Sequence, residues 1–243
     1  VAAVGAGSVS DHYTVWGLVL ARAGSRGIPQ KNLASVGGLP LVLRAVNQAL
    51  RVSAINHVLV STDDDNVIKL VATENVRVIR RPPELATHSA RSAGAAIHAL
   101  KTAGAQNKDV VCLLQPTSPL RSDDDVERAL AGLGSEGSCV TVVEPEHHPF
   151  KAFLESARGL DAVRDFADLE APRQELPRAV SPNGAVYVTR VADLRSGNSF
   201  FVHPVRTVLM PHNRSLDIDS PEDLELAEAL ICAAHAAAER RPD

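Results

Sequence analysis

The chain has 243 residues, a net charge of −4 and an apolar fraction of 45%, which fits one large domain or a domain with a small appendage. An aromatic fraction of only 3% leaves aliphatic side chains to build the core, and this suits a buried parallel sheet better than a β-sandwich. The slightly acidic balance provides no basic field for nucleic acid, and without an apolar run of about 18 residues we expect no membrane span.

The N-terminal residues and the cysteines both give information on the cellular location of the protein. Residues 1–13 read as an N-terminal tail, because they lack the basic start and long apolar core of a signal peptide. Gly5 and Gly7 lack the preceding strand and third glycine of a dinucleotide-binding fingerprint. Of the scattered cysteines Cys112, Cys139 and Cys232, two lie in apolar, strand-like runs. We therefore expect reduced thiols and a cytoplasmic location.

The first predicted strand, Val15–Leu20, runs into a short polar loop. The polarity switch at Arg22 marks the carboxyl end of that strand. Gly24 and Gly27 would let backbone N–H groups face an anion without interference from a Cβ atom. A hydroxyl and three cations accompany them: Ser25, Arg22, Arg26 and Lys31. The loop therefore predicts a phosphate-binding site, with an ordinary surface turn as the alternative.

The chain then alternates between strands and helices. Apolar runs predict strands over 56–63, 76–81, 109–114 and 138–143. Helical spacing of apolar residues predicts helices over 39–50, 64–75, 89–100 and 123–133. The run 109–114 is the most continuous and predicts a central strand. Such alternation predicts a doubly wound α/β sheet with ligands at the carboxyl ends of its strands.

The alternation of strands and helices stops between about 145 and 182. The stretch contains five prolines, the pair His147-His148 and mixed charge. It is too long for a simple connector in a compact domain, so we expect a functional or intersubunit segment. The two adjacent histidines would point in opposite directions in an extended chain and are a poor metal site. Strands are predicted again over 185–189 and 206–210.

Asp217-Ile218-Asp219 precedes the closing helix, which starts at 220–223 with a serine cap, a proline and two acids. If Ile218 points into the core, the two carboxylates project together on the opposite side. Hard oxygen ligands so placed suit Mg²⁺ together with phosphate oxygens and water. The alternative is one capping acid and one solvated acid.

Other polar residues fit a ligand but are individually weak signals. Gln115, after the central strand, offers both a donor and an acceptor for a base or a hydroxyl. Lys151 and Arg173 could bind a carboxylate, although solvated surface charges are the alternative. Asn183-Gly184 is more commonly a turn. These features together favour a nucleotide-dependent transferase or hydrolase without naming a substrate.

Eight stretches of the chain resemble one family in content, order and spacing. They are LARAGSRGIPQKN (20–32), RRPPELAT (80–87), LLQPTSPLR (113–121), EHHPFK (146–151), PRQELP (172–177), PNGAVYV (182–188), FF (200–201) and SLDIDSPEDL (215–224). They resemble the N-acylneuraminate cytidylyltransferases, also called CMP-sialic acid synthetases. The deoxyoctulosonate-type cytidylyltransferases fit less well, because they have a different opening loop and lack the FF and EHHP stretches.

The resemblance implies a Rossmann-like α/β fold with a mostly parallel sheet, spanning 14–243, and a homodimer. The segment at about 145–182 would be a protruding dimerisation segment that completes the neighbour's acceptor site. The implied reaction transfers CMP from CTP to an acidic sugar, releases pyrophosphate and uses Mg²⁺. A non-catalytic nucleotide-binding module is the alternative class, and it predicts loss of the phosphate cations or of the aspartate pair, all of which are present.

Carried over by position, the family's site maps onto three groups of residues. The resemblance assigns catalysis to Arg22, Lys31, Asp217 and Asp219, the two aspartates being the metal ligands. It assigns CTP binding to Ala21, Arg22, Gly24, Ser25, Arg26, Asn32, Arg81, Ser92 and Gln115. It assigns acceptor binding to Gln115, Lys151, Arg173, Asn183, Tyr187, Phe200 and Phe201.

Three positions depart from the family pattern on the acceptor side. His88 stands where aspartate is common, and Arg91 where small residues are usual. Ser181 replaces an arginine that many bacterial relatives carry. The acceptor could therefore be another nonulosonic acid, a phosphonate or another small acid of a secondary pathway.

Overall fold

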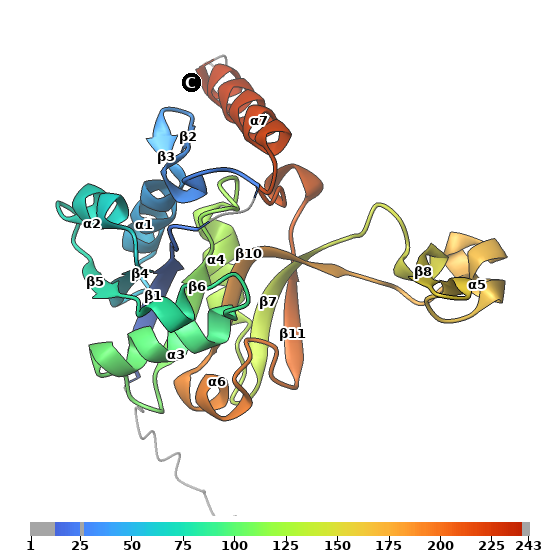
Figure 1. Ribbon diagram of the computed structural model, residues 1–243, viewed down its shortest axis with the longest axis horizontal. Coiled ribbons are helices and arrows are strands. Elements are labelled where there is room, and N and C mark those ends of the chain that lie inside the picture. Colours follow the sequence, from blue (N-terminus) through green and yellow to red (C-terminus); the bar gives the residue numbers. More distant parts are fainter. Residues whose placement is uncertain (1–12, 25–26, 240–243) are drawn as a thin grey trace, which may run out of the picture.

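A computed structural model describes residues 13–24 and 27–239 (Figure 1). Its centre is a seven-stranded sheet with the order β11-β7-β10-β6-β1-β4-β5. The strands are β1 (Val15–Leu20), β4 (His57–Thr62), β5 (Arg77–Arg80), β6 (Val110–Leu114), β7 (Ser138–Val143), β10 (Ser181–Arg190) and β11 (Val205–Leu209). The pairs β1–β4, β1–β6, β4–β5 and β7–β11 are parallel, and β10 is antiparallel to both of its neighbours. The predicted doubly wound, mostly parallel sheet is confirmed.

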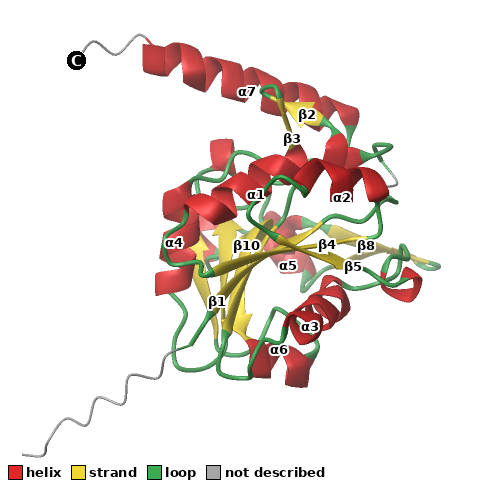
Figure 2. Ribbon diagram, turned by 90° about the vertical axis from the view of Figure 1, so that its left-hand side faces the viewer, coloured by secondary structure: helices red, strands yellow, loops and turns green. Residues whose placement is uncertain are grey.

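Helices cover both faces of this sheet (Figure 2). One face packs against α1 (Leu41–Arg51), α2 (Asp65–Val71) and α4 (Asp123–Ala131). The other packs against α3 (Ser92–Ala103) and α6 (Val191–Gly197). The buried residues are mostly Val, Leu and Ala, as the scarcity of aromatic residues requires. Among the described residues, none of the helices combines the length and apolarity needed to cross a bilayer.

The carboxyl edge of the sheet is closed by a smaller layer. Helix α7 (Pro221–Glu239) contacts the hairpin of β2 (Ser35–Val36) and β3 (Leu39–Pro40). Ile28, Leu41, Ile218 and Ile231 belong to the apolar cluster between them. The cluster thereby joins the loop after β1 to the segment that carries Asp217 and Asp219.

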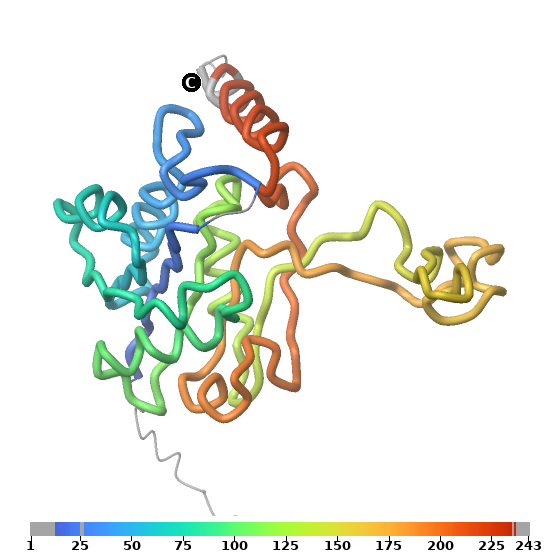
Figure 3. Tube along the Cα trace, in the orientation of Figure 1, coloured from blue at the N-terminus to red at the C-terminus, as the bar shows by residue number. Residues whose placement is uncertain are grey.

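The segment between β7 and β10 extends away from the sheet (Figures 1 and 3). We call residues 145–180 the arm. It contains a hairpin of β8 (Phe153–Ser156) and β9 (Gly159–Ala162), followed by α5 (Phe166–Glu170). Several of its large apolar side chains are exposed, including Phe153, Leu154, Leu160 and Phe166. The expected protrusion is present, and its role in dimerisation stays a prediction.

Short 3-10 helices connect these elements at η1 (Lys31–Leu33), η2 (Pro83–Leu85), η3 (Pro149–Lys151), η4 (Arg173–Glu175) and η5 (His212–Arg214). Two predicted helices differ clearly in their bounds. The helix expected at 64–75 ends at Val71, and the helix expected at 89–100 begins at Ser92 and ends at Ala103. Residues 87–90 instead form a turn in which the Ala90 N–H donates to the Thr87 carbonyl. Gly104, with φ 87°, provides the left-handed C-cap.

Candidate active site

A cleft of about 370 Å³ lies beyond the carboxyl ends of β1 and β6. It is lined from the loop after β1, from η1, from the residues before α3, from the loop after β6 and from the segment before α7. Its polar lining residues are Arg22, Lys31, Asn32, Arg81, His88, Arg91, Ser92, Gln115, Thr117, Asp217 and Asp219. Residues far apart in the sequence therefore meet at one edge of the sheet, because parallel strands end on the same side.

Gly27 brings the loop after β1 against the aspartate segment. A Cβ atom at this position would collide with the carbonyl oxygen of Asp219. Only glycine therefore permits this approach. Ser25 and Arg26, which were predicted to bind phosphate, lie outside the described residues. Gly24 lies in the same loop but does not line the cleft.

Three cations in the cleft are held by protein oxygens. Lys31 Nζ donates to the Ile218 carbonyl at 2.7 Å and forms an ion pair with Asp219 Oδ1 at 2.9 Å. Arg22 donates to the Thr87 carbonyl at 2.7 Å. Arg81 is buried and donates to the Ser61 carbonyl at 2.7 Å. Burial lowers the pKa of Arg81 to about 10, so it stays charged near neutrality.

Asn32 and Ala21 hold the loop after β1 in place. Asn32 is buried, lines the cleft and donates from Nδ2 to the Arg22 carbonyl at 2.8 Å. Ala21 is fully buried and does not line the cleft. Its N–H donates to the Ser61 carbonyl at 3.0 Å, which continues the β1–β4 ladder. Ala21 thus fixes the loop at its origin.

Asp217 and Asp219 both line the cleft because Ile218 between them is fully buried. The Ile218 N–H donates to the Thr117 carbonyl at 2.8 Å, which places this segment beside the loop after β6. Partial burial and the charge of Asp219 raise the pKa of Asp217, opposed by hydrogen bonding from Thr117 and the charge of Lys31. A cation beside this carboxylate would relieve that penalty.

The two aspartates fit a divalent cation that also binds substrate. Among residues 13–24 and 27–239, no three His, Cys, Asp or Glu side chains are grouped so as to hold a metal ion. Mg²⁺ commonly takes one or two carboxylates and fills its other positions with phosphate oxygens and water. The donor set of Asp217 and Asp219 matches that pattern.

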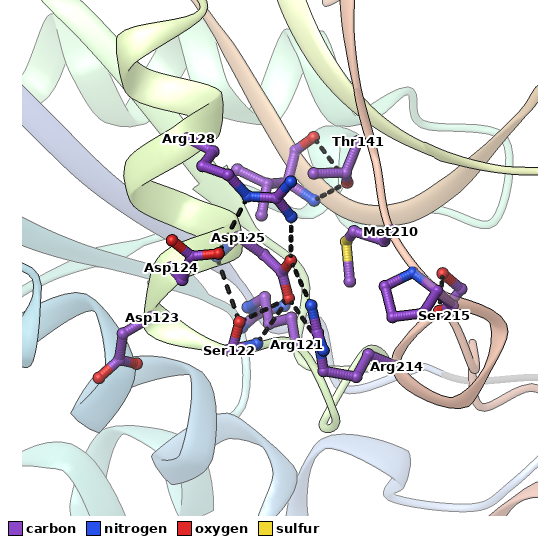
Figure 4. Close-up of polar contacts among 12 residues, drawn as sticks. Arg121, Ser122, Asp123, Asp124, Asp125, Arg128, Thr141, Met210, Arg214 and Ser215 are labelled. Carbon is purple, nitrogen blue, oxygen red and sulfur yellow. Dashed lines mark hydrogen bonds and ion pairs between the residues drawn. The ribbon is translucent and has the colours of Figure 1, made fainter.

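Asp125 fixes the start of the aspartate segment (Figure 4). Its carboxylate is fully buried and accepts two bonds from Arg214, at 2.9 and 3.0 Å, and one from Arg128 at 2.7 Å. It also accepts from the N–H and hydroxyl of Ser122. Despite burial, these bonds lower the pKa of Asp125 to about 2. Because Arg214 lies three residues before Asp217, the pair holds that segment against α4.

Arg121 fixes the loop after β6 in the same way. It is buried and donates to the Gln115 carbonyl at 2.6 Å, the Ala185 carbonyl at 3.2 Å and Gln48 Oε1 at 2.6 Å. The Gln115 backbone is thereby held between β6 and β10. Sequence reasoning did not select Arg121, Asp125 or Arg214, although the Ser122–Asp125 capping box was a visible signal.

A second cavity of about 200 Å³ adjoins the cleft and shares Arg91, Ser92 and Gln115 with it. Tyr187, Phe200 and Phe201 form its aromatic wall. The ring centroid of Tyr187 lies 5.8 Å from that of Phe200 and 5.7 Å from that of Phe201. Burial and the charge of Asp217 raise the pKa of Tyr187, so its hydroxyl stays protonated. Four residues predicted for the acceptor meet here: Gln115, Tyr187, Phe200 and Phe201.

The other three acceptor-side residues do not line either cavity. Lys151 donates to the Leu169 carbonyl at 3.1 Å, and Arg173 donates to the Pro145 and Glu146 carbonyls at 2.9 and 3.1 Å, all within the arm. Asn183 is buried beneath the site. Its amide binds Ser215 Oγ at 2.9 Å and accepts from Thr141 at 2.7 Å. Asn183 therefore supports the site rather than lining it.

Thr117 was not selected from the sequence, although it follows Gln115 in the same loop and lines the cleft. His88 and Arg91 were singled out only as departures from a family pattern. Both line the cleft from the turn before α3. Two of the three positions where this chain differs from that pattern thus lie at the site, whereas Ser181, the first residue of β10, lines neither cavity.

Comparisons with known proteins show what the chain is similar to. The family profile described as cytidylyltransferase matches residues 16–175. The chain is 30% identical to CMP-N,N'-diacetyllegionaminic acid synthase of Legionella pneumophila, over 88% of this chain and 94% of that protein. It is 29% identical to N-acylneuraminate cytidylyltransferase of Streptococcus agalactiae over 85% of this chain, and it spans about half the length of that relative, 50%.

Solved structures share the fold. The structure of CMP:2-keto-3-deoxy-manno-octonic acid synthetase complexed with CTP superposes with a TM-score of 0.70 at 21% identity, covering 91% of this chain and 99% of the other. A 4-diphosphocytidyl-2C-methyl-D-erythritol synthase superposes with a TM-score of 0.64 at 15% identity, covering 90% and 99%. At such identities the likeness establishes the α/β architecture alone.

Proposed function

We propose a reaction for this chain on the basis of its family, because the chain belongs to the cytidylyltransferases. The resemblance predicted from the sequence is confirmed by these relatives. The proposed reaction transfers CMP from CTP to an acidic sugar and releases pyrophosphate. The observation that carries it is the pair of adjoining cavities, one lined by cations and carboxylates and the other by aromatic rings, with Gln115 and Ser92 between them.

In this proposal the first cavity binds CTP. Attack on the α-phosphorus spreads negative charge over the transferring group and the departing pyrophosphate. Arg22, Lys31 and Arg81 would stabilise that charge from positions already fixed by protein carbonyls. Because they need not reorganise during the reaction, positioning and electrostatics would supply most of the rate enhancement. The backbone near Gly27 would approach the phosphates closely.

Asp217 and Asp219 would hold Mg²⁺. When bound, the metal would neutralise negative charge at the phosphates and lower the pKa of the attacking hydroxyl. Lys31 binds Asp219 at 2.9 Å and orients that carboxylate toward the cleft. The hydrogen bond between Ile218 and Thr117 keeps the two carboxylates on the side of Gln115. This scheme requires no side chain as a dedicated base.

The second cavity would bind the acceptor, and its aromatic wall suits a sugar ring or an acyl substituent. We propose a nonulosonic acid such as an N-acylneuraminate, with a phosphonate or other small acid as the second candidate because His88 and Arg91 line the site. We also propose a homodimer in which the partner's arm supplies Lys151 and Arg173, supported by the exposed apolar side chains of the arm. The buried thiols of Cys112 and Cys139 support a cytoplasmic location.

The direct test measures pyrophosphate release from CTP and Mg²⁺ with a panel of acids. The panel contains N-acetylneuraminate, N,N'-diacetyllegionaminate, a deoxyoctulosonate and simple phosphonates. ATP, GTP and UTP replace CTP in parallel reactions, and EDTA removes the metal. We expect release only with CTP, with at least one acid, and only with the metal present. Absence of release with CTP across the whole panel would refute the proposed transfer.

A further inference from the structure

Arg91 occupies the boundary between the two cavities. It is the N-cap residue of α3 and lines both the cleft and the aromatic cavity. Ser92 and Gln115 are the other residues common to both. The loop before Arg91 is fixed by the bond from Arg22 to the Thr87 carbonyl at 2.7 Å. Arg91 is therefore an exposed cation on a fixed loop, at the place where donor and acceptor would meet.

The guanidinium of Arg91 differs from the other cations of the cleft. Arg22, Lys31 and Arg81 each bind a protein carbonyl at 2.7 Å. Within the part of the chain that the structure describes, the Arg91 guanidinium has no hydrogen bond or ion pair to protein. Its five N–H donors are thus available for a ligand. A planar, bidentate fork of this kind matches a carboxylate.

The chemistry of the acceptor requires a cation at this boundary. In a sugar acid of the N-acylneuraminate type, the carboxylate is bonded to the same carbon as the attacking hydroxyl. When that hydroxyl attacks the α-phosphorus, the carboxylate must lie close to the phosphoryl oxygens. Two anions would then repel each other in a partly desolvated site. A cation that contacts both cavities can offset this repulsion.

We propose that Arg91 binds the carboxylate of the acceptor and so selects acids whose carboxylate is carried by the attacking carbon. The inference rests on the proposed cytidylyl transfer and adds a specificity residue to it. The positive dipole end of α3 lies on the same side, because Ser92, its first residue, lines both cavities. Arg91 would complement Lys151 and Arg173, which bind carbonyls of their own arm in the single chain.

The test compares N-acetylneuraminate with its methyl ester, which retains the sugar but has no carboxylate charge. For the native protein we expect kcat/KM for the acid to exceed that for the ester about 100-fold. Arg91→Gln should lower kcat/KM for the acid about 10- to 100-fold and change the ester less than about threefold, with KM for CTP nearly unchanged. Arg91→Lys should fall between, because it keeps the charge without the fork.

Arg80→Gln is the matched control, since Arg80 pairs with Asp65 on the surface at 2.5 Å and lines neither cavity. An equal loss for acid and ester in Arg91→Gln, a rise in KM for CTP alone, or no change would overturn the assignment. If the native protein releases no pyrophosphate with any acid, the transfer itself fails. Ligand-observed NMR of acid and ester with the CTP-loaded protein then decides for Arg91: a preference for the acid that disappears in Arg91→Gln supports it, and its absence refutes it.

Discussion

The cleft and the arm differ in where the partners of their charged side chains lie. In the cleft, the cations bind groups of other elements: Lys31 binds Asp219, and Arg22 binds the Thr87 carbonyl. In the arm, Lys151 and Arg173 bind carbonyls of the arm itself, while the rings of Phe153 and Phe166 are 51% and 60% exposed. The described residues of the cleft are therefore held by contacts within one chain, whereas the arm leaves apolar side chains exposed. This difference predicts that a substitution in the cleft impairs the site of its own subunit. A substitution in the arm should instead impair the site of the partner subunit.

The largest effect is expected at Asp219. Asp219→Ala should lower kcat by about a thousandfold or more, because it removes one of the two carboxylates beside the transferring phosphate. CTP binding, measured by isothermal titration, should change less than about tenfold because the cations remain. Asp124→Ala is the matched control, because this exposed carboxylate pairs with Arg128 on α4 and lines neither cavity. Near-normal turnover of Asp219→Ala would remove the metal assignment.

The arm variant tests whether a second subunit is required. Lys151→Gln combined with Arg173→Gln should lower kcat/KM for the acid about 100-fold, since two charge-assisted contacts are lost, and should leave CTP binding intact. Mixing this variant with Asp219→Ala after dissociation and reassociation should restore about a quarter of native activity, because one site in each hybrid dimer is intact. No recovery in a verified hybrid, or a monomeric native protein in sedimentation, would contradict the arrangement.

The Asp125 cluster makes stability depend on pH. The pKa of Asp125 is about 2 in the folded protein, below its ordinary 3.8. Its ionised form therefore stabilises the fold above pH 4, and this contribution is lost as the pH falls through about 2. The difference in unfolding free energy between native protein and Asp125→Asn should narrow by about 2 kcal/mol between pH 6 and pH 2. Urea titrations measure it.

Asp168 gives the corresponding control in the arm, where it pairs with Arg164. Asp168→Asn should leave the global unfolding midpoint nearly unchanged, because the arm contributes few contacts to the central core. A pH dependence equal to that of Asp125→Asn would show that arm and cleft unfold as one unit. That result would contradict the contrast drawn between the two regions.

The smallest effect is expected at Gly27. A methyl group there would collide with the Asp219 carbonyl, so Gly27→Ala should displace the loop and raise KM for CTP about tenfold. Gly159→Ala, at the β8–β9 turn of the arm with φ 118° and no atom nearby, should strain only the arm and leave KM for CTP unchanged. Equal effects of the two substitutions would show that the loop is not held as described.

The strands of the central sheet could be predicted because each is an aliphatic run with a polar end, as in 109–114 and β6, whereas the exposed or very short strands of the β2–β3 and β8–β9 hairpins were not predicted. Helix boundaries were less accurate. The turn at 87–90 depends on the Thr87 carbonyl, which also accepts from Arg22, 65 positions away. The local sequence does not indicate a contact with a residue so far away. The predicted helix was therefore started three residues before the observed start of α3.

The site was predictable where spacing alone brings groups together. Asp217 and Asp219 project to one side because Ile218 is buried, and this follows from extended geometry. Asn183 was assigned to the acceptor side, but Ser215 and Thr141, 32 and 42 positions away, engage its amide. Arg121 was not selected at all, because its function depends on the carbonyl of Gln115 in the loop after β6 and on that of Ala185 in β10.

The sequence by itself determined the α/β class, the polar clusters at the strand ends and the family, because periodicity and motif order are local properties of the chain. Only the tertiary structure decided which clusters share a cavity, which arginines are buried as supports and which cation stays available at the boundary. Those outcomes depend on burial and on partners distant in sequence. Arg91 therefore stood out in the sequence as an unusual residue, and the fold placed it between the two cavities.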